Sequence, residues 1–437
     1  MNPYWKIKRL IMNKTTISAG ISKVDISPSQ NQIDEYRKLH KEQFQDVKHH
    51  LFARILALRD DHTGRITIIV GSDLINVPDY FLLRERLVKA YTLNPTDIIL
   101  GGTQNHASIV SDPPDFEADK RPALLLQVRD DIHNRIFAGV GEAISNLKPA
   151  VIGWGSIPSI IGINKDKTII EGIPAGANLN MYEENELFIL LVKDLKTGKP
   201  VAAMLNYGMQ GVFYSTMVDS HISGDIHGAI SAKLEEHYGD GFIAPYLIDA
   251  SGDRSPLING DLQVFQTKGD SLVQEKVPMP EEAQDKILDW LAGIQLNDAV
   301  TLINRIDCNV NKLNIRSAEV FQKGKTRIPP HVTEKQGDDQ PVIIPTKTHR
   351  LHFVALTDDL CFACGNSITQ SDLGRLVKDC LPIKTVYISV EGGVSGYVVA
   401  RTTRAETFGY RYCPFSDAEE SERIYVESIR KMYRDAE

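Results

Sequence analysis

The alternation of apolar and polar positions predicts β-strands along the whole chain. Its clearest instance is Thr16 to Ile26, which alternates over its full length and stops at Ser27-Pro28, a typical turn. The run Leu351 to Cys364 predicts two strands with a turn at Asp358-Asp359. The remaining predicted strands cover residues 51–58, 66–70, 98–101, 187–192, 201–205, 243–248, 305–311, 313–320 and 385–390.

Apolar residues spaced three and four positions apart predict helices between these strands. The longest covers Ala123 to Leu147, and Pro149 lies just beyond its end. Since no linker or repeat separates the elements, we expect one large α/β domain with a mixed sheet over residues 15–437. The other predicted segments are helices near 81–91, 228–237, 278–290 and 417–432, a flexible arm at 1–14, a loop with some helix at 29–50, and the longest loop at 323–346.

Composition narrows the functional class only slightly. With 49 Lys and Arg against 57 Asp and Glu, the 437-residue chain has a net charge of −8, which argues against a nucleic-acid partner. It has no apolar run of about eighteen residues, so no transmembrane segment is expected. The N-terminal residues lack the apolar stretch of a signal peptide, which favours a cytoplasmic location.

The five cysteines are few and widely spaced, so a disulfide framework is not expected. Cys361 and Cys364 form one Cys-x-x-Cys unit, a spacing that also occurs in redox and zinc sites. Because no second unit accompanies it and both residues lie in a predicted strand, a position in the hydrophobic core is favoured.

Polar residues that are capable of catalysis follow several predicted strands, where loops commonly gather functional groups on a rigid scaffold. The segments are Gly101 to His106, Asn206 to Gln210 with Ser223 to Gly228, Asp249 to Pro256, and Gly365 to Ser367 with Gly392 to Tyr397. Taken singly, each is a weak signal.

Together and in this order, these segments resemble the neutral/alkaline, non-lysosomal ceramidase family. The resemblance begins at Ala19 to Pro28, which is similar to that family's opening AGxxKVDITP, and extends roughly to residue 410. It implies that family's α/β catalytic domain, here without the C-terminal immunoglobulin-like domain of many relatives, and a zinc amidase that cleaves the N-acyl bond of ceramide. The other matching motifs are Ala53-Arg54, Ser72-Asp73-Leu74, Asn206-Tyr207, Ser223-Gly224-Asp225, Gly252 to Pro256 and Gly396-Tyr397.

The positions that the resemblance assigns to zinc ligands carry other residues here. Gln104 and Gln210 stand where the family has histidines, and Asn366 stands where it has a glutamate; of the ligand set only Tyr397 remains. The family's arginine is Lys165, and a second active-site tyrosine has no match. Neutral amides are weak zinc ligands, so we expect a degenerate zinc site and no cofactor. Because the residues that replace the zinc ligands are polar, we expect that a polar pocket is still present.

The resemblance also assigns catalytic positions. Ser255 occupies the position of the family's serine, either as a nucleophile or as a turn residue before Pro256. His106 matches a family histidine and is suited to act as general base, or else it is structural. Tyr397 is a candidate donor to an oxyanion, or a packing residue. Gln104, Lys165, Gln210 and Asn366 are the candidate substrate-binding residues.

The leading hypothesis is a zinc-independent, ceramidase-like amidohydrolase or acyl-transfer enzyme that acts on an N-acyl or acyl-bearing small molecule, as in a biosynthetic tailoring step or in lipid metabolism. One alternative is a true zinc ceramidase whose metal site is rebuilt from His106, His221, His227 and Asp225. The other is a non-catalytic protein that binds a lipid or metabolite. The sequence leaves a homo-oligomer open.

Overall fold

The computed structural model describes residues 16–40, 44–112, 120–165, 184–214, 220–269, 271–328, 342–402 and 415–436. The predicted arm at 1–14 and the middle of the predicted loop 323–346 lie outside these ranges. None of the described helices is long and apolar enough to cross a membrane.

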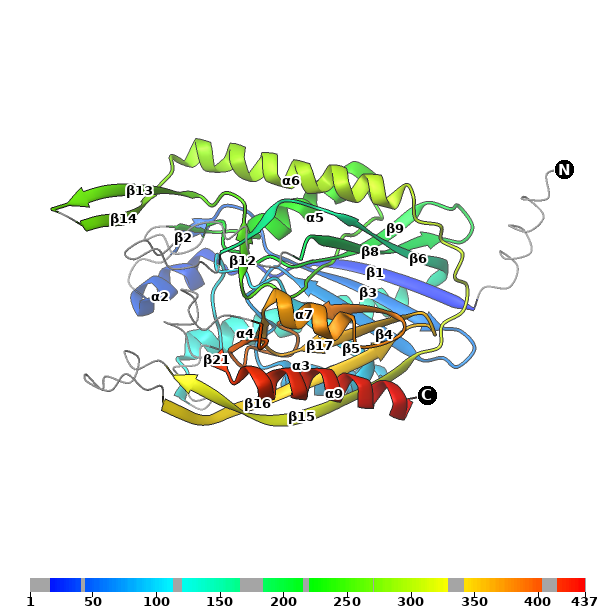
Figure 1. Cartoon of the computed structure of the whole chain (residues 1–437). Coiled ribbons are helices and arrows are strands. Elements are labelled where there is room, and N and C mark those ends of the chain that lie inside the picture. The colour runs from blue at the N-terminus through cyan, green and yellow to red at the C-terminus, as the bar shows by residue number, and fades with distance from the viewer. Residues whose placement is uncertain are drawn as a thin grey trace.

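An eight-stranded mixed sheet forms the centre of the molecule (Figure 1). β4 and β5 run parallel, as do β9 and β11, while β3 pairs antiparallel with β1. The edge strand β11 packs against β4 and β5, because Gly71 has no side chain where a Cβ would lie 2.6 Å from the Tyr246 carbonyl oxygen. In spatial order the strands are β11 (Tyr246–Ile248), β9 (Pro200–Tyr207), β8 (Glu186–Asp194), β6 (Lys148–Pro158), β1 (Ile17–Asp25), β3 (Phe52–Asp60), β4 (Ile66–Ser72) and β5 (Ile98–Gly102).

A second, seven-stranded sheet packs against the first. Its strands in spatial order are β18 (Ile368–Thr369), β20 (Tyr397–Val398), β21 (Phe415–Ser416), β15 (Arg316–Ile328), β16 (Val342–Ala355), β17 (Leu360–Gly365) and β19 (Lys384–Ile388). Three strand pairs complete the β-structure: β2 (Phe44–Val47) with β10 (Ser220–Ile222), β7 (Gly162–Asn164) with β12 (Arg254–Pro256), and β13 (Asp261–Lys268) with β14 (Ser271–Pro278), the last of which projects from the body (Figure 1).

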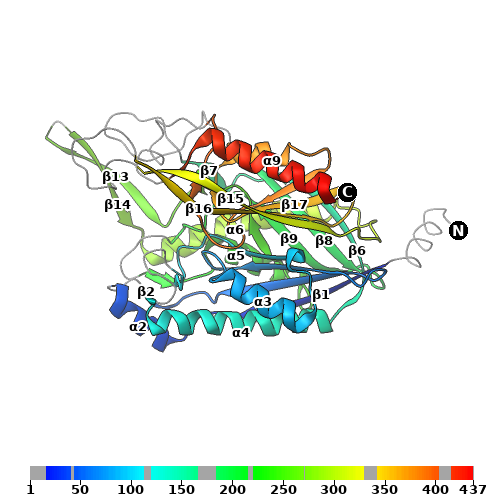
Figure 2. The same ribbon diagram turned by 90° about the horizontal axis from the view of Figure 1, so that it is seen from below.

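Helices cover the outer face of each sheet, so the layers run helices, sheet, sheet, helices (Figures 1 and 2). α4 packs on β1 and β3, α6 packs on β6 and β8, and α9 packs on β15 and β16. The helices are α2 (Gln30–His40), α3 (Tyr80–Tyr91), α4 (Ala123–Ser145), α5 (Asp225–Tyr238), α6 (Glu281–Ile303), α7 (Ser371–Lys378) and α9 (Ala418–Ala436), with a 3₁₀ turn, η1, at Pro95–Asp97.

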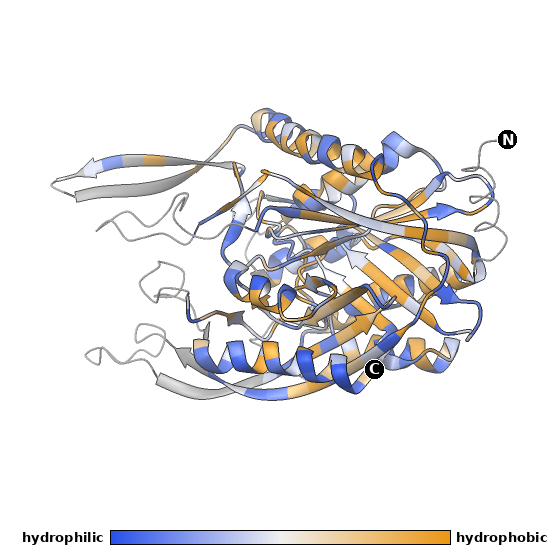
Figure 3. Ribbon diagram, turned by 45° about the vertical axis from the view of Figure 1, so that its right-hand side comes forward, coloured by the Kyte–Doolittle hydropathy of each residue, from blue (hydrophilic) through white to orange (hydrophobic). Residues whose placement is uncertain are grey.

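Strand alternation divides the core into layers, and Figure 3 shows apolar residues along these strands. On β3, Leu56 packs between the two sheets, while Ile55 is on the opposite face and packs against the helices that cover the first sheet. On β17, Cys364 faces the space between the sheets and Cys361 faces the layer of α7 and α9. Both cysteines are 0% exposed, which confirms their predicted position in a core strand.

The mixed α/β class and most predicted elements are confirmed, although the strands are shared between two sheets. The strand predicted at 305–311 is wrong: Arg305 and Ile306 still donate to the Leu302 carbonyl at the end of α6, and a single bridge joins Val310 to Ile152. The loop predicted at 323–346 is wrong at both ends, because β15 continues to Ile328 and β16 begins at Val342. Backbone pairing with the apolar start of β16, Val342 to Ile344, holds the polar end of β15 as a strand.

Candidate functional site

The loops that follow β5, β9 and β11 contact one another. This contact is expected from the sequence, because each loop directly follows a strand. The His106 N–H donates to the Gly211 carbonyl over 2.8 Å, and the Gln210 N–H donates to the Arg254 carbonyl over 3.2 Å. The segment Gln210–Gly211 therefore lies between the loop that carries His106 and the strand that carries Ser255.

Gln104 and Gln210 are brought together by the loop after β11. The Ser251 hydroxyl donates to Gln104 Oε1 over 3.2 Å, and Gln210 Nε2 donates to the carbonyls of Ser251 and Gly252, both over 3.0 Å. The two glutamines are only 1% and 9% exposed, respectively. Both carboxamides thus satisfy buried protein groups, which stabilises the contact between the loops.

Asn366 and Tyr397 belong to a second group of loops, at the edge of the other sheet. The Asn366 carbonyl accepts from the Ser395 N–H over 2.7 Å, and Tyr397 pairs with Ile368 in the register of β18 and β20. The Gly252 N–H donates to the Thr369 carbonyl over 2.8 Å, which joins this group to the loop that holds Gln104 and Gln210.

Ser255 and Lys165 lie on the β7–β12 pair. Ser255 is partly exposed and faces Ile163 in the register, and the Lys165 N–H donates to the Asp253 carbonyl over 2.8 Å. Within the described residues no hydrogen bond joins Ser255 to His106. The His106 ring is largely buried, and burial lowers its pKa, so the ring is neutral at pH 7 and able to accept a proton.

Asp225 and Asp253 are structural anchors that accept hydrogen bonds in tight turns. The Asp225 carboxylate accepts from the N–H groups of Phe213 and Tyr214, and the Asp253 carboxylate accepts from Asn164 Nδ2 and from both the N–H and the hydroxyl of Ser371. Burial raises the pKa of Asp225, and it raises the pKa of Asp253 to about 6.

Sequence reasoning missed Asn105, which sets the shape of the loop between Gln104 and His106. Its side chain is fully buried; Nδ2 donates to the carbonyls of Asp73 (2.9 Å) and Ser223 (2.6 Å), and Oδ1 accepts from the Ala107 N–H (2.8 Å). The available signal was an asparagine within a turn, a residue type that bonds to nearby backbone.

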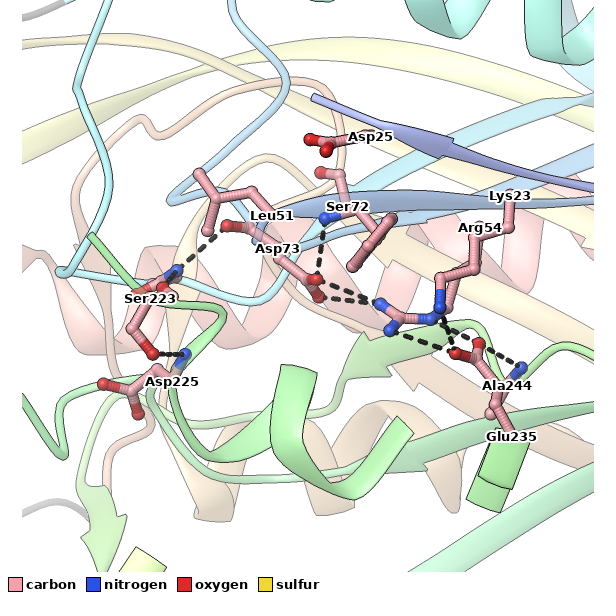
Figure 4. Close-up of polar contacts among 12 residues, drawn as sticks. Lys23, Asp25, Leu51, Arg54, Ser72, Asp73, Ser223, Asp225, Glu235 and Ala244 are labelled. Carbon is pink, nitrogen blue, oxygen red and sulfur yellow. Dashed lines mark hydrogen bonds and ion pairs between the residues drawn. The ribbon is translucent and has the colours of Figure 1, made fainter. Parts of the chain in front are cut away.

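A buried ion-pair group holds Asp73, one of the partners of Asn105 (Figure 4). Arg54 lies between Asp73 and Glu235, with Nη1 3.0 Å from Asp73 Oδ2 and Nε 2.6 Å from Glu235 Oε1. Arg54 is 1% exposed, so water does not solvate its guanidinium group. The two carboxylates compensate its buried positive charge instead. The group holds Asp73, whose carbonyl accepts from Asn105.

A cavity of about 800 Å³ opens beside these loops, a volume within the range of small-molecule sites. Asn185 and Lys378 are among its lining residues. Asn185 Oδ1 accepts from Arg254 Nη2 over 2.8 Å, and Lys378 Nζ donates to Asp249 Oδ2 over 2.9 Å. The lining residue Asn185 therefore contacts Arg254, the neighbour of Ser255, but neither Arg254 nor any predicted site residue lines the cavity.

The residues at the position predicted to be a degenerate zinc site do not fit that metal. The side chains of Gln104 and Gln210 are neutral and already bonded within the protein. The rebuilt site is not formed within the described residues either, since the ligand atoms of His106, His221, His227 and Asp225 do not lie within 4.8 Å of one another. His221 pairs with Asp46 instead. His227 is buried against the Tyr246 ring, and burial lowers its pKa to about 3.

Comparison with known proteins shows a shared fold. No protein-family model matches the chain, and no curated protein matches it. Among solved structures, the neutral ceramidase from Pseudomonas aeruginosa is similar with a TM-score of 0.69 and 14% identity, over 96% of this chain and 74% of that one. A ceramidase complexed with C2 gives a TM-score of 0.71 and 13% identity, over 97% and 76% of the two chains. The chain therefore has the fold of the neutral ceramidases.

Proposed function

We propose that this chain is a ceramidase-like hydrolase or acyl-transfer enzyme that acts on an N-acyl or acyl-bearing small molecule, without a zinc ion at Gln104, Gln210 and Asn366. The observation that carries the proposal is the meeting of three strand-end loops, which places His106 and Ser255 on either side of Gln210–Gly211. The shared fold supports a hydrolase of this general type.

In the proposed reaction, a substrate carbonyl binds across the Gln210–Gly211 segment. The Ser255 oxygen attacks the carbonyl carbon while His106 accepts the hydroxyl proton. Tyr397 donates to the oxyanion. The C–N bond then breaks, His106 gives its proton to the leaving amine, and water or a second nucleophile releases the acyl group from Ser255. Lys165 and Asn366 would bind and orient the substrate, while Gln104 and Gln210, whose carboxamides bond within the protein, would hold the loops around it.

The test is turnover of short-chain and long-chain N-acyl sphingosines and N-acyl amines by the full chain, with the released amine measured by mass spectrometry. We expect Ser255→Ala and His106→Asn each to lower kcat/KM at least about 100-fold, in line with the loss of a nucleophile or a general base. Ser145→Ala, at the exposed end of α4, is the matched control and leaves the rate unchanged.

The two alternatives give different results in the same assay. A zinc ceramidase would lose turnover on dialysis against a chelator and regain it with zinc, in the Cys364→Ala variant as well as in the wild type. A binding protein would retain affinity for an acyl ligand in Ser255→Ala and would show no turnover. Either result would overturn the proposed function.

A further inference from the structure

Three residues with metal-binding side chains gather between the two sheets. His352 on β16 lies directly opposite Cys364 on β17 in the strand register, and Glu391 follows β19. One ligand atom from each lies within 4.8 Å of the others, and all three residues are 0% exposed. None of them belongs to the candidate site described above.

The bonding of His352 leaves one ring nitrogen available to a ligand. Nε2 lies 2.8 Å from the Thr96 carbonyl oxygen, which can only accept, so Nε2 carries the hydrogen and Nδ1 carries the lone pair. Nδ1 is buried and has no hydrogen-bond partner. Its distance to Glu391 Oε2 is 3.5 Å, which exceeds a normal hydrogen bond. A histidine that donates its other N–H to a backbone carbonyl is the usual arrangement around a metal-bound imidazole.

Hydrogen bonds also fix the orientation of the Glu391 carboxylate. Arg350 Nη1 bonds to Glu391 Oε2, and Arg350 is itself held by Glu319 over 2.8 Å and by the Tyr80 hydroxyl over 2.9 Å. Metal-ligating carboxylates are commonly fixed by such outer hydrogen bonds. Arg350 also forms an ion pair with Glu319, so Glu391 does not balance the positive charge of Arg350 alone.

We propose that His352 Nδ1, Cys364 Sγ and Glu391 bind one divalent metal ion, which joins β16 and β17 to the turn after β19 on the face of the second sheet that packs against the first. A thiolate, an imidazole and a carboxylate together match zinc better than calcium or magnesium, which take oxygen ligands. The other Glu391 oxygen, Oε1, lies 3.4 Å from the Leu100 nitrogen, so that N–H also helps to hold the carboxylate. On binding, the Cys364 thiol releases its proton to solvent and the thiolate bonds to the metal.

The test is the metal content of the full chain, purified without a metal-affinity tag after growth with added zinc. Cys361→Ala is the matched control, because Cys361 lies on the same strand, is equally buried and faces the opposite side. We expect about one zinc per chain in the wild type and in Cys361→Ala, and less than about a tenth of that in Cys364→Ala. The wild type loaded with Co²⁺ should show a thiolate-to-cobalt charge-transfer band that Cys361→Ala retains.

Two readouts guard against a variant that fails to fold. Cys364→Ser keeps the size of the side chain, and its circular dichroism spectrum reports whether it has folded. Chelation of the wild type should lower the melting temperature, and zinc should restore it. A wild type that contains no metal and gives no cobalt band would overturn the proposal, as would a folded Cys364→Ser with undiminished zinc; the cluster would then be a metal-free hydrogen-bonded network.

Discussion

Gln104 accepts a hydrogen bond from the hydroxyl of Ser251 over 3.2 Å, and both residues are almost completely buried. This contact joins the loop after β5 to the loop after β11. A side chain at a predicted zinc-ligand position therefore contributes to the structure of the site directly.

Gln104→Ala is expected to lower the free energy of unfolding by about 1–3 kcal/mol, because it leaves the buried Ser251 hydroxyl without its partner. Gln104 has a φ of 50°, in the left-handed region. Gln104→Gly should therefore recover up to about 1 kcal/mol relative to alanine, since glycine adopts this conformation without strain. Urea unfolding measures both variants, and an alanine variant as stable as the wild type would contradict the role assigned to the contact.

Asn105→Ala should lower the free energy of unfolding by more than about 2 kcal/mol, because the carbonyls of Asp73 and Ser223 and the Ala107 N–H all lose their partner. The exposed Asn134 on α4 is the control, and its replacement by alanine should change stability by less than about 0.5 kcal/mol. Equal effects at the two positions, measured by urea unfolding, would show that Asn105 does not hold this loop.

Arg54→Met should cost about 3–5 kcal/mol, because it leaves Asp73 and Glu235 buried without their cation. Replacing all three charged residues by apolar ones of similar size should cost less than the single change. Arg59→Met removes a more exposed ion pair to Asp61 and is expected to cost less than about 1 kcal/mol. The prediction fails in thermal or urea unfolding if Arg54→Met resembles Arg59→Met.

Stability should fall as the pH decreases below about 6.5, because buried His227 stays neutral in the folded state, with a pKa of about 3, while the unfolded chain takes up a proton. Between pH 6.5 and 5 this one residue contributes a loss of about 2 kcal/mol. His227→Gln should reduce the difference in unfolding free energy between pH 7.5 and 5 by that amount. His237→Gln, on the exposed side of the same helix, should leave the difference unchanged. An unaltered difference in His227→Gln would refute the assignment.

Placing zinc ligands at the three positions of the predicted degenerate site tests whether Gln104, Gln210 and Asn366 surround a common centre. In a Cys364→Ala background, which removes the inter-sheet ligand, the triple variant Gln104→His, Gln210→His, Asn366→Glu should bind zinc at least about 100-fold more tightly than its parent. Isothermal titration measures the difference. If the triple variant binds zinc no better, these three side chains do not converge.

Local patterns predicted much of the fold. The run from Thr16 to Ile26 forms the strand expected, and it alternates because Ile17 and Ala19 pack between the sheets while Gly20 and Ser22 face α4. The long hairpin of β15 and β16 was partly missed, because the end of β15 is polar and is held as a strand by backbone pairing with the start of β16. The meeting of Gln104 with Gln210 was expected from the resemblance, whereas Asn105 was missed because its partners lie on distant segments.

The sequence by itself determined the chemistry available at each position: uncharged carboxamides at 104, 210 and 366, one imidazole at 106, and the alternation that makes each strand two-faced. Tertiary structure alone decided which of these groups meet. His352 and Cys364 become neighbours through the register of β16 and β17, and Glu391 reaches them through the turn after β19. The physical reason is that strand pairing and sheet packing are set by the burial of apolar surface over the whole chain, and this places polar side chains from distant segments in contact.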